Sequence, residues 1–388
     1  MFKVQTFNKI SKTGLNQFPT ELYEVSPDIQ HPDAIIVRSH PLHDMQFPHS
    51  VKVIGRAGAG VNNIPVVALT KMGIPVLCTP GANANAVSEL VLAGMLMASR
   101  NLCQAWDYVR HLQGKDDALN TAIEQDKKQF IGVELMGKTL GIVGLGSIGV
   151  RVANAAIHLG MRVIGYDPTI SVNRAWELSS NVIQAHSLDE LLSQSDFVTL
   201  HVPLVDATKK MIDHNRLQLM KHHAVLLNFA RDGIVDNQAL SETLNNKKIA
   251  AYVTDFPCAL LKDNPAVISL PHLGASTKEA EENCAVMLVK QVRNYLEFGG
   301  ITNSANFPTV EVTQHYAGIR LAVVNANVPN MVAQISSTLA SADLNILGLV
   351  NKSRDEIAYT LLDVEGKVTD AVIKNIASID GVLQVRKI

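Results

Sequence analysis

Four polar or titratable residues in this sequence stand at, or just after, the end of a short apolar stretch: His201, Arg231, Asp255 and His272. Each apolar stretch has the length of a buried strand. In an open parallel sheet, the carboxyl ends of the strands border the crevice that binds a ligand. We therefore expect these four side chains to line one site.

Two of the four residues have the side-chain chemistry to act on a substrate that carries a carboxylate and a hydroxyl group. Arg231 could hold the substrate carboxylate with two parallel hydrogen bonds. His272 could take the hydroxyl proton, because imidazole titrates near neutral pH. Other roles stay open, since Arg231 could be a surface or capping arginine, His272 a hydrogen-bonded structural histidine, and Asp255 only a cap.

The stretch from Leu140 to Pro168 has the pattern of a dinucleotide-binding unit. An apolar strand is followed by three glycines at the spacing G-x-G-x-x-G and then by a helical segment. The first glycine permits the tight turn, the second lets a pyrophosphate approach the backbone, and the third lets the helix pack closely on the strand. The N–H groups around Ser147 and Ile148 would then favour bound phosphate. The three glycines are Gly144, Gly146 and Gly149.

An acidic residue completes this unit. The second strand, Met161 to Tyr166, ends at Asp167. At this place a carboxylate accepts hydrogen bonds from an adenosine ribose and repels a 2′-phosphate. The sequence therefore predicts NAD rather than NADP as the cofactor. The alternative is a plain strand–helix turn without a cofactor.

Composition excludes several other classes of protein. The chain has 388 residues, 47% hydrophobic and 18% charged, with a net charge of −2. The chain has no overall basic character, so its charge does not indicate nucleic acid or a membrane surface as a partner. The N-terminal residues MFKVQTFNKI lack a signal-peptide apolar run, and the most apolar window, Val87 to Ala98, is short for a bilayer span. The cysteines are dispersed and no histidine pair has accompanying metal ligands, so we expect a metal-free cytoplasmic protein.

Strands and helices alternate over most of the chain, which predicts an α/β fold. We expect a doubly wound parallel sheet of the Rossmann type (91–275), inserted in a smaller flavodoxin-like substrate-binding domain (1–90 and 276–303). A linker (304–317) would lead to a ferredoxin-like βαββαβ domain (318–388). Between these features we expect a buried helix over Asn85 to Arg100, capped by Ser88, and a less regular exposed arm over Tyr108 to Lys128. One long helix, Thr277 to Glu297, would return the chain to the first domain.

Several segments resemble the D-2-hydroxyacid dehydrogenase family, in particular its phosphoglycerate dehydrogenases. The motif GLGSIG is shared by many oxidoreductases, whereas HLGAST with a C-terminal ACT-like domain is more specific. The resemblance implies NAD-dependent oxidation of 3-phospho-D-glycerate to 3-phosphohydroxypyruvate, the first step of L-serine biosynthesis, by a homodimer or homotetramer. The segments are VIGRAGAGVNNI (Val53–Ile64), TPGANANAVSE (Thr79–Glu89), GKTLGIVGLGSIG (Gly137–Gly149), LNFARDGIVD (Leu227–Asp236) and PHLGAST (Pro271–Thr277).

The resemblance also implies which residues bind which molecule. The NAD site would comprise Thr79, Gly144, Gly146, Ser147, Ile148, Gly149, Asp167, His201, Val202, Pro203, Phe229, Ala230, Asp255, Gly274 and Ala275. The substrate site would comprise Arg38, Arg56, Ala57, Gly58, Arg231 and His272, with Arg231 and His272 catalytic. An effector site for L-serine would use Asn325, Asn327 and Asn345, although Asn330 replaces the glycine that relatives usually carry.

One position departs from the family pattern. The family usually has a glutamate five residues after the position of Asp255, and this glutamate orients the catalytic histidine. Here the aligned residue is Leu260, and the nearest acid, Asp263, is out of register. His272 would therefore work without a carboxylate partner, or another segment would supply one.

Two other functions remain compatible with the sequence. One is a reductase for a different 2-keto acid, and the other is a non-catalytic regulatory protein that senses NAD on the same fold. The presence of both Arg231 and His272, together with Arg56 in the GRAGAG turn, favours the enzyme.

Overall fold

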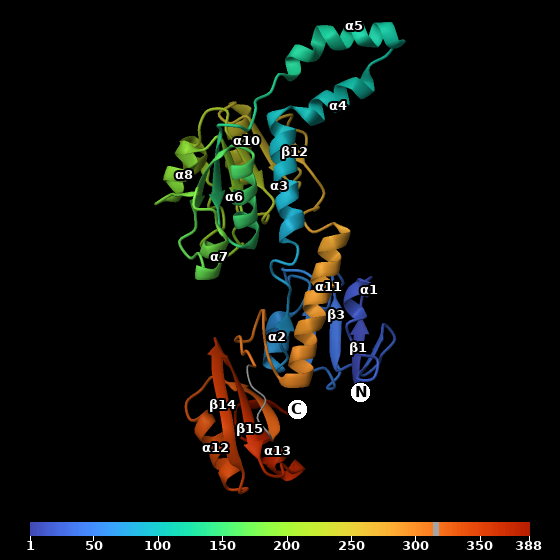
Figure 1. Ribbon diagram of the computed structural model, residues 1–388, viewed down its shortest axis with the longest axis vertical. Helices are drawn as coiled ribbons and strands as arrows, with labels where there is room; N and C mark the ends of the chain where they lie inside the picture. Colours follow the sequence, from blue (N-terminus) through green and yellow to red (C-terminus); the bar gives the residue numbers. More distant parts are fainter. Residues whose placement is uncertain (313–317) are drawn as a thin grey trace. The chain divides into compact units, whose positions relative to one another are not determined.

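The computed structural model describes residues 1–312 and 318–388. The chain divides into two compact units (Figure 1). One unit consists of Met1–Asn83 together with Lys278–Ile388, and the other is Ala84–Thr277. The second unit is thus inserted in sequence between the two segments of the first.

The unit Ala84–Thr277 is built on a seven-stranded parallel sheet with the order β12-β11-β10-β9-β6-β7-β8. The six strands from β8 to β11 reproduce the doubly wound order of a Rossmann fold, with β12 added at one edge. Its central strands are buried on both faces, so they read as continuous apolar runs in the sequence. The Rossmann-type fold is therefore confirmed. The strands are β6 (Thr139–Val143), β7 (Arg162–Tyr166), β8 (Ile183–Gln184), β9 (Phe197–Leu200), β10 (Val225–Asn228), β11 (Ala251–Thr254) and β12 (Val267–Ser269).

The helices of this unit differ from expectation in two places. Ser88 is buried inside α3, where its hydroxyl donates to the carbonyl of Asn85, so it does not cap the helix. The expected irregular arm is instead helical, with α4 and α5 joined by a short loop. The helices are α3 (Ala84–Ser99), α4 (Leu102–His111), α5 (Asp116–Asp126), η1 (Lys127–Phe130), α6 (Ser147–His158), α7 (Val172–Glu177), α8 (Leu188–Gln194), α9 (His214–Leu219) and α10 (Asn237–Asn245).

The other unit begins with a five-stranded parallel sheet in the order β2-β1-β3-β4-β5, which is the flavodoxin-like order. Helix α11 packs against this sheet and against α1. Gly14 of α1 makes this packing possible, because a Cβ there would lie 2.5 Å from the Cβ of Ala285. The elements are β1 (Phe2–Thr6), α1 (Lys12–Leu15), β2 (Tyr23–Ser26), β3 (Ala34–Val37), β4 (Val53–Arg56), α2 (Val66–Lys71), β5 (Val76–Leu77) and α11 (Lys278–Arg293).

The expected long helix changes its winding near its end. After α11 the chain continues as a π-helical turn, η2 (Asn294–Phe298), and stops at Gly299. Gly299 has φ of 78°, a left-handed conformation that glycine adopts without a steric cost.

The segment expected to be a linker is partly a packed element of this unit. Ile301, Phe307 and Val310 are buried in the same apolar cluster as α11 and the first sheet. Backbone bridges pair Ile301 with Val310, and Leu77 of β5 with Ser304. The linker expectation is therefore wrong for residues 304–312, and its remaining part, 313–317, lies outside the described residues.

The C-terminal portion has the element order βαββαβ, as expected. Its antiparallel sheet has the order β14-β15-β13-β16, which is ferredoxin-like. No single described helix has the length and apolar composition of a membrane span, and only α3 with α4, bent by 63°, passes that test as a pair. The C-terminal elements are β13 (Ile319–Ala326), α12 (Met331–Ala340), β14 (Asn345–Arg354), β15 (Ile357–Glu365), α13 (Asp370–Ala377) and β16 (Val382–Lys387).

This C-terminal sheet packs on the end of α11. The guanidinium of Arg320 makes a buried bidentate ion pair with Asp363, at 2.7 Å for each bond, and also donates to the carbonyl of Phe298. The Tyr359 hydroxyl donates to the Gly299 carbonyl at 2.7 Å. These contacts fix the C-terminal domain to the first domain within one compact unit.

Candidate active site

Three adjacent strands bring the predicted catalytic residues to one edge of the seven-stranded sheet. Arg231 follows β10, Asp255 follows β11, and His272 follows β12, and these strands are neighbours in the sheet. His201 follows β9, which pairs with β10 on the other side. Because all four strands are parallel, the four residues share the carboxyl edge, as the sequence predicted.

A buried amide shapes the turn that carries Arg231. Asn228, 1% exposed, donates to the carbonyl of Arg231 at 3.0 Å and to the hydroxyl of Tyr252 at 3.3 Å. Its side-chain oxygen accepts a bond from the N–H of Ala230. The buried Asn228 amide therefore fixes the backbone of this turn. The Arg231 side chain is exposed at the sheet edge and donates one N–H to the Ala230 carbonyl.

Asp255 is almost fully buried, at 1% exposure. One carboxylate oxygen accepts the N–H of Gly274 at 3.0 Å, and the other, Oδ1, is buried without a hydrogen bond. Burial raises the pKa of this carboxyl, while the Gly274 N–H and nearby His272 act in the opposite direction. A buried acceptor without a donor is costly, so Oδ1 fits a ligand N–H such as a carboxamide.

His272 is exposed, with its ring centroid 4.9 Å from that of Phe256. Leu260 is exposed as well, and Asp263 forms an ion pair with Lys262 at 2.7 Å. Among the described residues of Ala84–Thr277, no carboxylate accepts a hydrogen bond from the His272 ring. The charge of His272 does lower the pKa of the neighbouring Asp255 carboxyl, against the larger effect of burial.

The glycine loop leaves room and N–H donors for phosphate. Helix α6 begins at Ser147 without a side-chain cap, and a Cβ at Gly146 would meet open space. Gly144 has φ of 92°, and a Cβ there would lie 2.7 Å from the His201 carbonyl oxygen. At Gly149 a Cβ would lie 2.0 Å from the Gly144 carbonyl oxygen. The loop therefore requires glycine at two positions for packing, and the third position stays open to a ligand.

His201 closes the loop from the side of β9. Burial lowers the pKa of His201 to about 3, so the ring is neutral at physiological pH. Its Nε2 lies 3.0 Å from the hydroxyl of Thr199, and its Nδ1 is buried without a partner. A neutral ring of this kind suits contact with the apolar face of a nucleotide.

Asp167 stands at the end of β7, beside the glycine loop. One oxygen accepts the N–H of Leu145 at 2.9 Å, and the other accepts the N–H and the hydroxyl of Thr169 at 2.9 and 3.1 Å. These bonds hold the carboxylate in place. The oxygen bonded to Leu145 has a further lone pair with which it can accept a ribose hydroxyl.

Replacement of Asp167 by alanine is expected to weaken NAD binding and to reduce the preference for NAD over NADP. The carboxylate both accepts ribose hydroxyls and repels a 2′-phosphate, and a charge-assisted hydrogen bond contributes about 1.5–3 kcal/mol. Affinities for NADH and NADPH, measured by fluorescence titration, test this. Asp189→Ala, on the exposed face of α8, is the control, and unchanged cofactor selectivity in the Asp167 variant would refute the role.

The residues proposed for the substrate phosphate belong to the other unit. Arg56 ends β4 and donates through Nε to the carbonyl of Arg38 at 3.1 Å, and Arg38 is ion-paired with Glu281 of α11. Thr79 donates its N–H to the carbonyl of Gly58 at 2.9 Å, which ties the end of β5 to the turn after Arg56. Ala57 donates its N–H to the carbonyl of Val37. These residues therefore form one cluster at the carboxyl edge of the five-stranded sheet.

The proposed effector residues do not meet within one chain. Asn325 is the penultimate residue of β13 and Asn345 begins β14, and these two strands run parallel on either side of β15. Asn325 and Asn345 therefore lie at opposite ends of the sheet. Asn327 is already bonded to the carbonyl of Asp355 at 3.0 Å. Asn330 has φ of 72°, which explains why relatives usually have glycine there and why asparagine is tolerated.

Comparison with known proteins gives the family. Residues 92–274 match the NAD-binding domain of D-isomer specific 2-hydroxyacid dehydrogenases. The chain is 38% identical to D-3-phosphoglycerate dehydrogenase of Methanocaldococcus jannaschii over 74% of this chain and 54% of that protein. It is 31% identical to D-3-phosphoglycerate dehydrogenase of Haemophilus influenzae over 94% of this chain and 88% of that protein.

A solved structure gives the same likeness. The NAD⁺-bound 3-phosphoglycerate dehydrogenase of Entamoeba histolytica superposes with a TM-score of 0.61 at 25% identity, over 79% of this chain and 98% of that one. The chain spans only about half the length of several phosphoglycerate dehydrogenases that it matches, between 52% and 55% of each. The match to the Haemophilus protein covers most of both chains. The protein therefore belongs to the D-isomer specific 2-hydroxyacid dehydrogenase family, with residues 92–274 as its NAD-binding domain.

Proposed function

We propose that this protein oxidises 3-phospho-D-glycerate to 3-phosphohydroxypyruvate with NAD. The observation that carries this proposal is the placement of Arg231, Asp255 and His272 after three adjacent strands, in the unit that holds the glycine loop. The relatives named D-3-phosphoglycerate dehydrogenase support the choice of substrate. In this reading, residues 1–90 and 276–303 bind substrate, 91–275 bind NAD, and 318–388 regulate.

Each residue has a defined task in the reaction. Arg231 holds the substrate carboxylate with its planar fork, and His272 takes the proton from the C2 hydroxyl. NAD, when bound, supplies the acceptor for the hydride that leaves C2. Asp255 Oδ1 accepts the carboxamide N–H, and the backbone N–H groups at the start of α6 hold the pyrophosphate. Together these contacts fix the distance between C2 and the cofactor.

The substrate phosphate requires cations of its own. Arg56 is the first candidate, because its guanidinium folds over the turn at Gly58 and lies 2.5 Å from the point where a Cβ would stand there. Arg38 is the second candidate, and its ion pair with Glu281 would have to rearrange to admit a phosphate. Both side chains come from the cluster that also contains the Gly58–Thr79 bond.

A spectrophotometric assay of NADH formation tests the proposed activity. We expect 3-phosphoglycerate to give a much higher kcat/KM than glycerate or lactate. Equal turnover of an unphosphorylated acid would instead make the protein a dehydrogenase for that acid. NAD binding without turnover of any of the three would point to the NAD-sensing alternative.

L-serine is expected to lower the activity by binding between C-terminal domains of two chains. A site with Asn327 and Asn345 needs a second chain, because these residues lie at opposite ends of one sheet. An effector must favour a less active arrangement to inhibit, and such couplings are typically about fivefold or more. Serine titrations of activity and calorimetry on the full chain test this, with Asn345→Ala as the variant and D-serine as the control. If activity does not change up to millimolar serine and calorimetry detects no heat of binding, the domain has an assembly role only.

We also propose that the protein is a homodimer or homotetramer in the cytoplasm. Helix α4 supports an oligomeric state. Its residues Leu102, Trp106 and Val109 lie on one side of the helix and are 48%, 61% and 52% exposed. An exposed apolar face of this kind is typical of an interface. The four cysteines form no disulfide, which supports the cytoplasmic location.

A further inference from the structure

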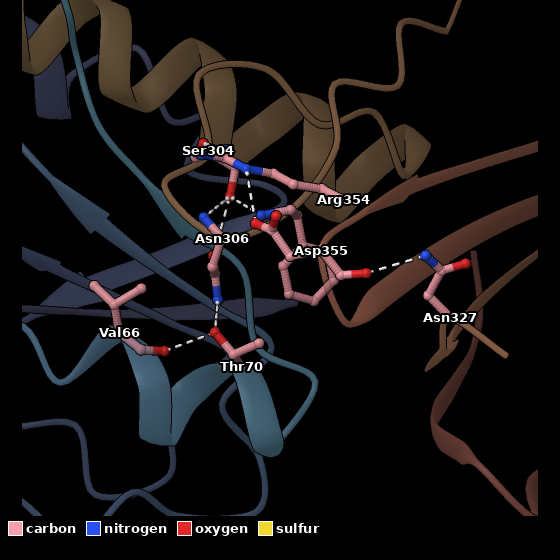
Figure 2. A network of polar contacts seen from close by, with 8 residues as sticks. Val66, Thr70, Ser304, Asn306, Asn327, Arg354 and Asp355 are labelled. Carbon is pink, nitrogen blue, oxygen red and sulfur yellow. Dashed lines mark hydrogen bonds and ion pairs between the residues drawn. The ribbon is translucent and has the colours of Figure 1, made fainter. Parts of the chain in front are cut away.

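The turn between β14 and β15 contacts a segment that belongs to the first domain. Arg354, the last residue of β14, donates from Nη1 to the carbonyl of Ser304 at 2.8 Å (Figure 2). Arg354 is 46% exposed in its side chain, and Asp355, which follows it, has φ of 51°. An arginine of the C-terminal domain therefore reaches the backbone of the first domain.

The segment that Arg354 contacts is the outer edge of the five-stranded sheet. Asn303 accepts the N–H of Cys78 at 3.0 Å, and Ala305 donates to the carbonyl of Val76 at 2.8 Å. Asn306, 8% exposed, accepts the N–H of Val76 and donates to the hydroxyl of Thr70 in α2, as Figure 2 shows in part. Residues 303–306 thus hold β5 and α2 together, and we call them the edge segment.

Strand β5 leads directly into the proposed substrate site. Cys78 is followed by Thr79, whose N–H is bonded to the carbonyl of Gly58 in the turn after Arg56. Burial raises the pKa of the Cys78 thiol, and the charges of Arg56 and Arg354 act in the opposite direction. The Cys78 thiol also donates to the carbonyl of Asn303 at 3.2 Å, so residue 78 is bonded to the edge segment through both its backbone and its side chain.

The same turn is bonded to the proposed effector residue on its other side. Asn327 donates from Nδ2 to the carbonyl of Asp355 at 3.0 Å, and its N–H donates to the carbonyl of Glu356 at 2.9 Å. Hydrogen bonds joined by short backbone steps therefore connect Asn327 through the turn to the edge segment, and the edge segment through Cys78 and Thr79 to Gly58.

We propose that Arg354 is a positioning residue for the substrate-binding turn at Arg56–Gly58. It fixes the edge segment, and the edge segment fixes Cys78 and Thr79 against Gly58. This inference rests on the proposed oxidation of 3-phosphoglycerate. It assigns the C-terminal domain a direct mechanical part in substrate binding, with the β14–β15 turn as the point of connection.

The kinetic test is Arg354→Ala. We expect KM for 3-phosphoglycerate to rise roughly two- to thirtyfold, the range found for residues that act through a network, with kcat and NAD affinity unchanged. R354K should restore part of the loss, because its ammonium keeps one donor for the Ser304 carbonyl. K352A is the matched control, because Lys352 carries the same charge on the same face of β14 and should leave KM unchanged.

Two kinetic outcomes would overturn the proposal. One is a wild-type KM in R354A. The other is a joint loss of kcat, NAD affinity and melting temperature, which would mean general destabilisation. If R354A fails to fold, R354M, which keeps most of the side-chain length but has no donor for the Ser304 carbonyl, decides between the same outcomes.

Hydrogen exchange gives a readout that does not depend on turnover. The N–H groups of Cys78 and Thr79 should exchange faster in R354A than in the wild type or in K352A, because the edge segment that holds them is loosened. Unchanged exchange at both amides would refute the positioning role. If the wild type does not oxidise 3-phosphoglycerate at all, the proposed function fails, and this measurement alone decides the role of Arg354.

A double-mutant cycle tests the connection to Asn327. N327A should raise KM in the same direction as R354A, and the double variant should be little worse than R354A alone, because both side chains act through one turn. If the two effects on KM multiply, Asn327 and Arg354 act separately and the connection is refuted.

Discussion

Replacement of His272 by alanine is expected to lower kcat by about 100- to 10,000-fold, the usual loss when a general base is removed. NAD affinity should remain close to that of the wild type. The reason lies in the placement of the residue, because His272 follows β12 and stands beside Asp255, whereas the phosphate-binding loop is formed by a different strand, β6.

Stopped-flow and steady-state measurements of NADH formation give kcat, and fluorescence titration gives the affinity for NADH. His222→Ala is a matched control, because His222 is an exposed histidine of the same unit that follows α9. Turnover near that of the wild type in the His272 variant would remove this residue from the reaction. A parallel loss of NAD affinity would mean that the side chain supports the cofactor site and not the proton transfer.

The sheets could be predicted because their central strands are buried on both faces. Strands such as β6, β9 and β10 expose none of their residues, so they appear in the sequence as continuous apolar runs between turns. In a parallel sheet such runs also fix where the strands end. This is why the sequence alone places His201, Arg231, Asp255 and His272 at one edge.

The structural features that the sequence did not predict depend on contacts between distant parts of the chain. The segment 301–312 has no periodicity, yet Phe307 and Val310 are buried because the end of α11 and the C-terminal sheet cover them. The segment Tyr108–Lys128 has no clear helical pattern in the sequence because α5 and the end of α4 bury none of their residues. Ser88 was assigned as a cap because serine favours that position, but helix α3 begins earlier, at Ala84.

Within the proposed site, the sequence indicated residues that could react but not the residue that holds their turn. Asn228 was not singled out, although its amide makes three bonds under the Arg231 turn. An asparagine at the end of a strand has many possible roles, and only the fold shows that its amide faces the turn. Likewise, the sequence suggested Asn327 and Asn345 as one site, whereas the strand order separates them within a chain.

Replacement of Arg231 by lysine is expected to lower kcat/KM for 3-phosphoglycerate by roughly tenfold to a hundredfold. Lysine keeps the charge but loses the planar fork, so one of two parallel hydrogen bonds to the carboxylate disappears, and a hydrogen bond to a charged group contributes about 1.5–3 kcal/mol. Within this turn the Asn228 amide bonds to backbone atoms and not to the Arg231 side chain, so the turn itself should keep its shape.

The loss in Arg231→Lys should therefore fall on substrate binding and turnover and spare NAD affinity and the melting temperature. Initial rates over a range of 3-phosphoglycerate concentrations, together with a titration of NADH, measure both. Arg174→Lys is the control, because Arg174 pairs with Glu177 on the exposed helix α7 and the exchange keeps its charge. The absence of any change in kcat/KM would show that the carboxylate is held elsewhere. A large loss with D-glycerate as well as with 3-phosphoglycerate would place the defect at the carboxylate, which both acids share, and not at the phosphate.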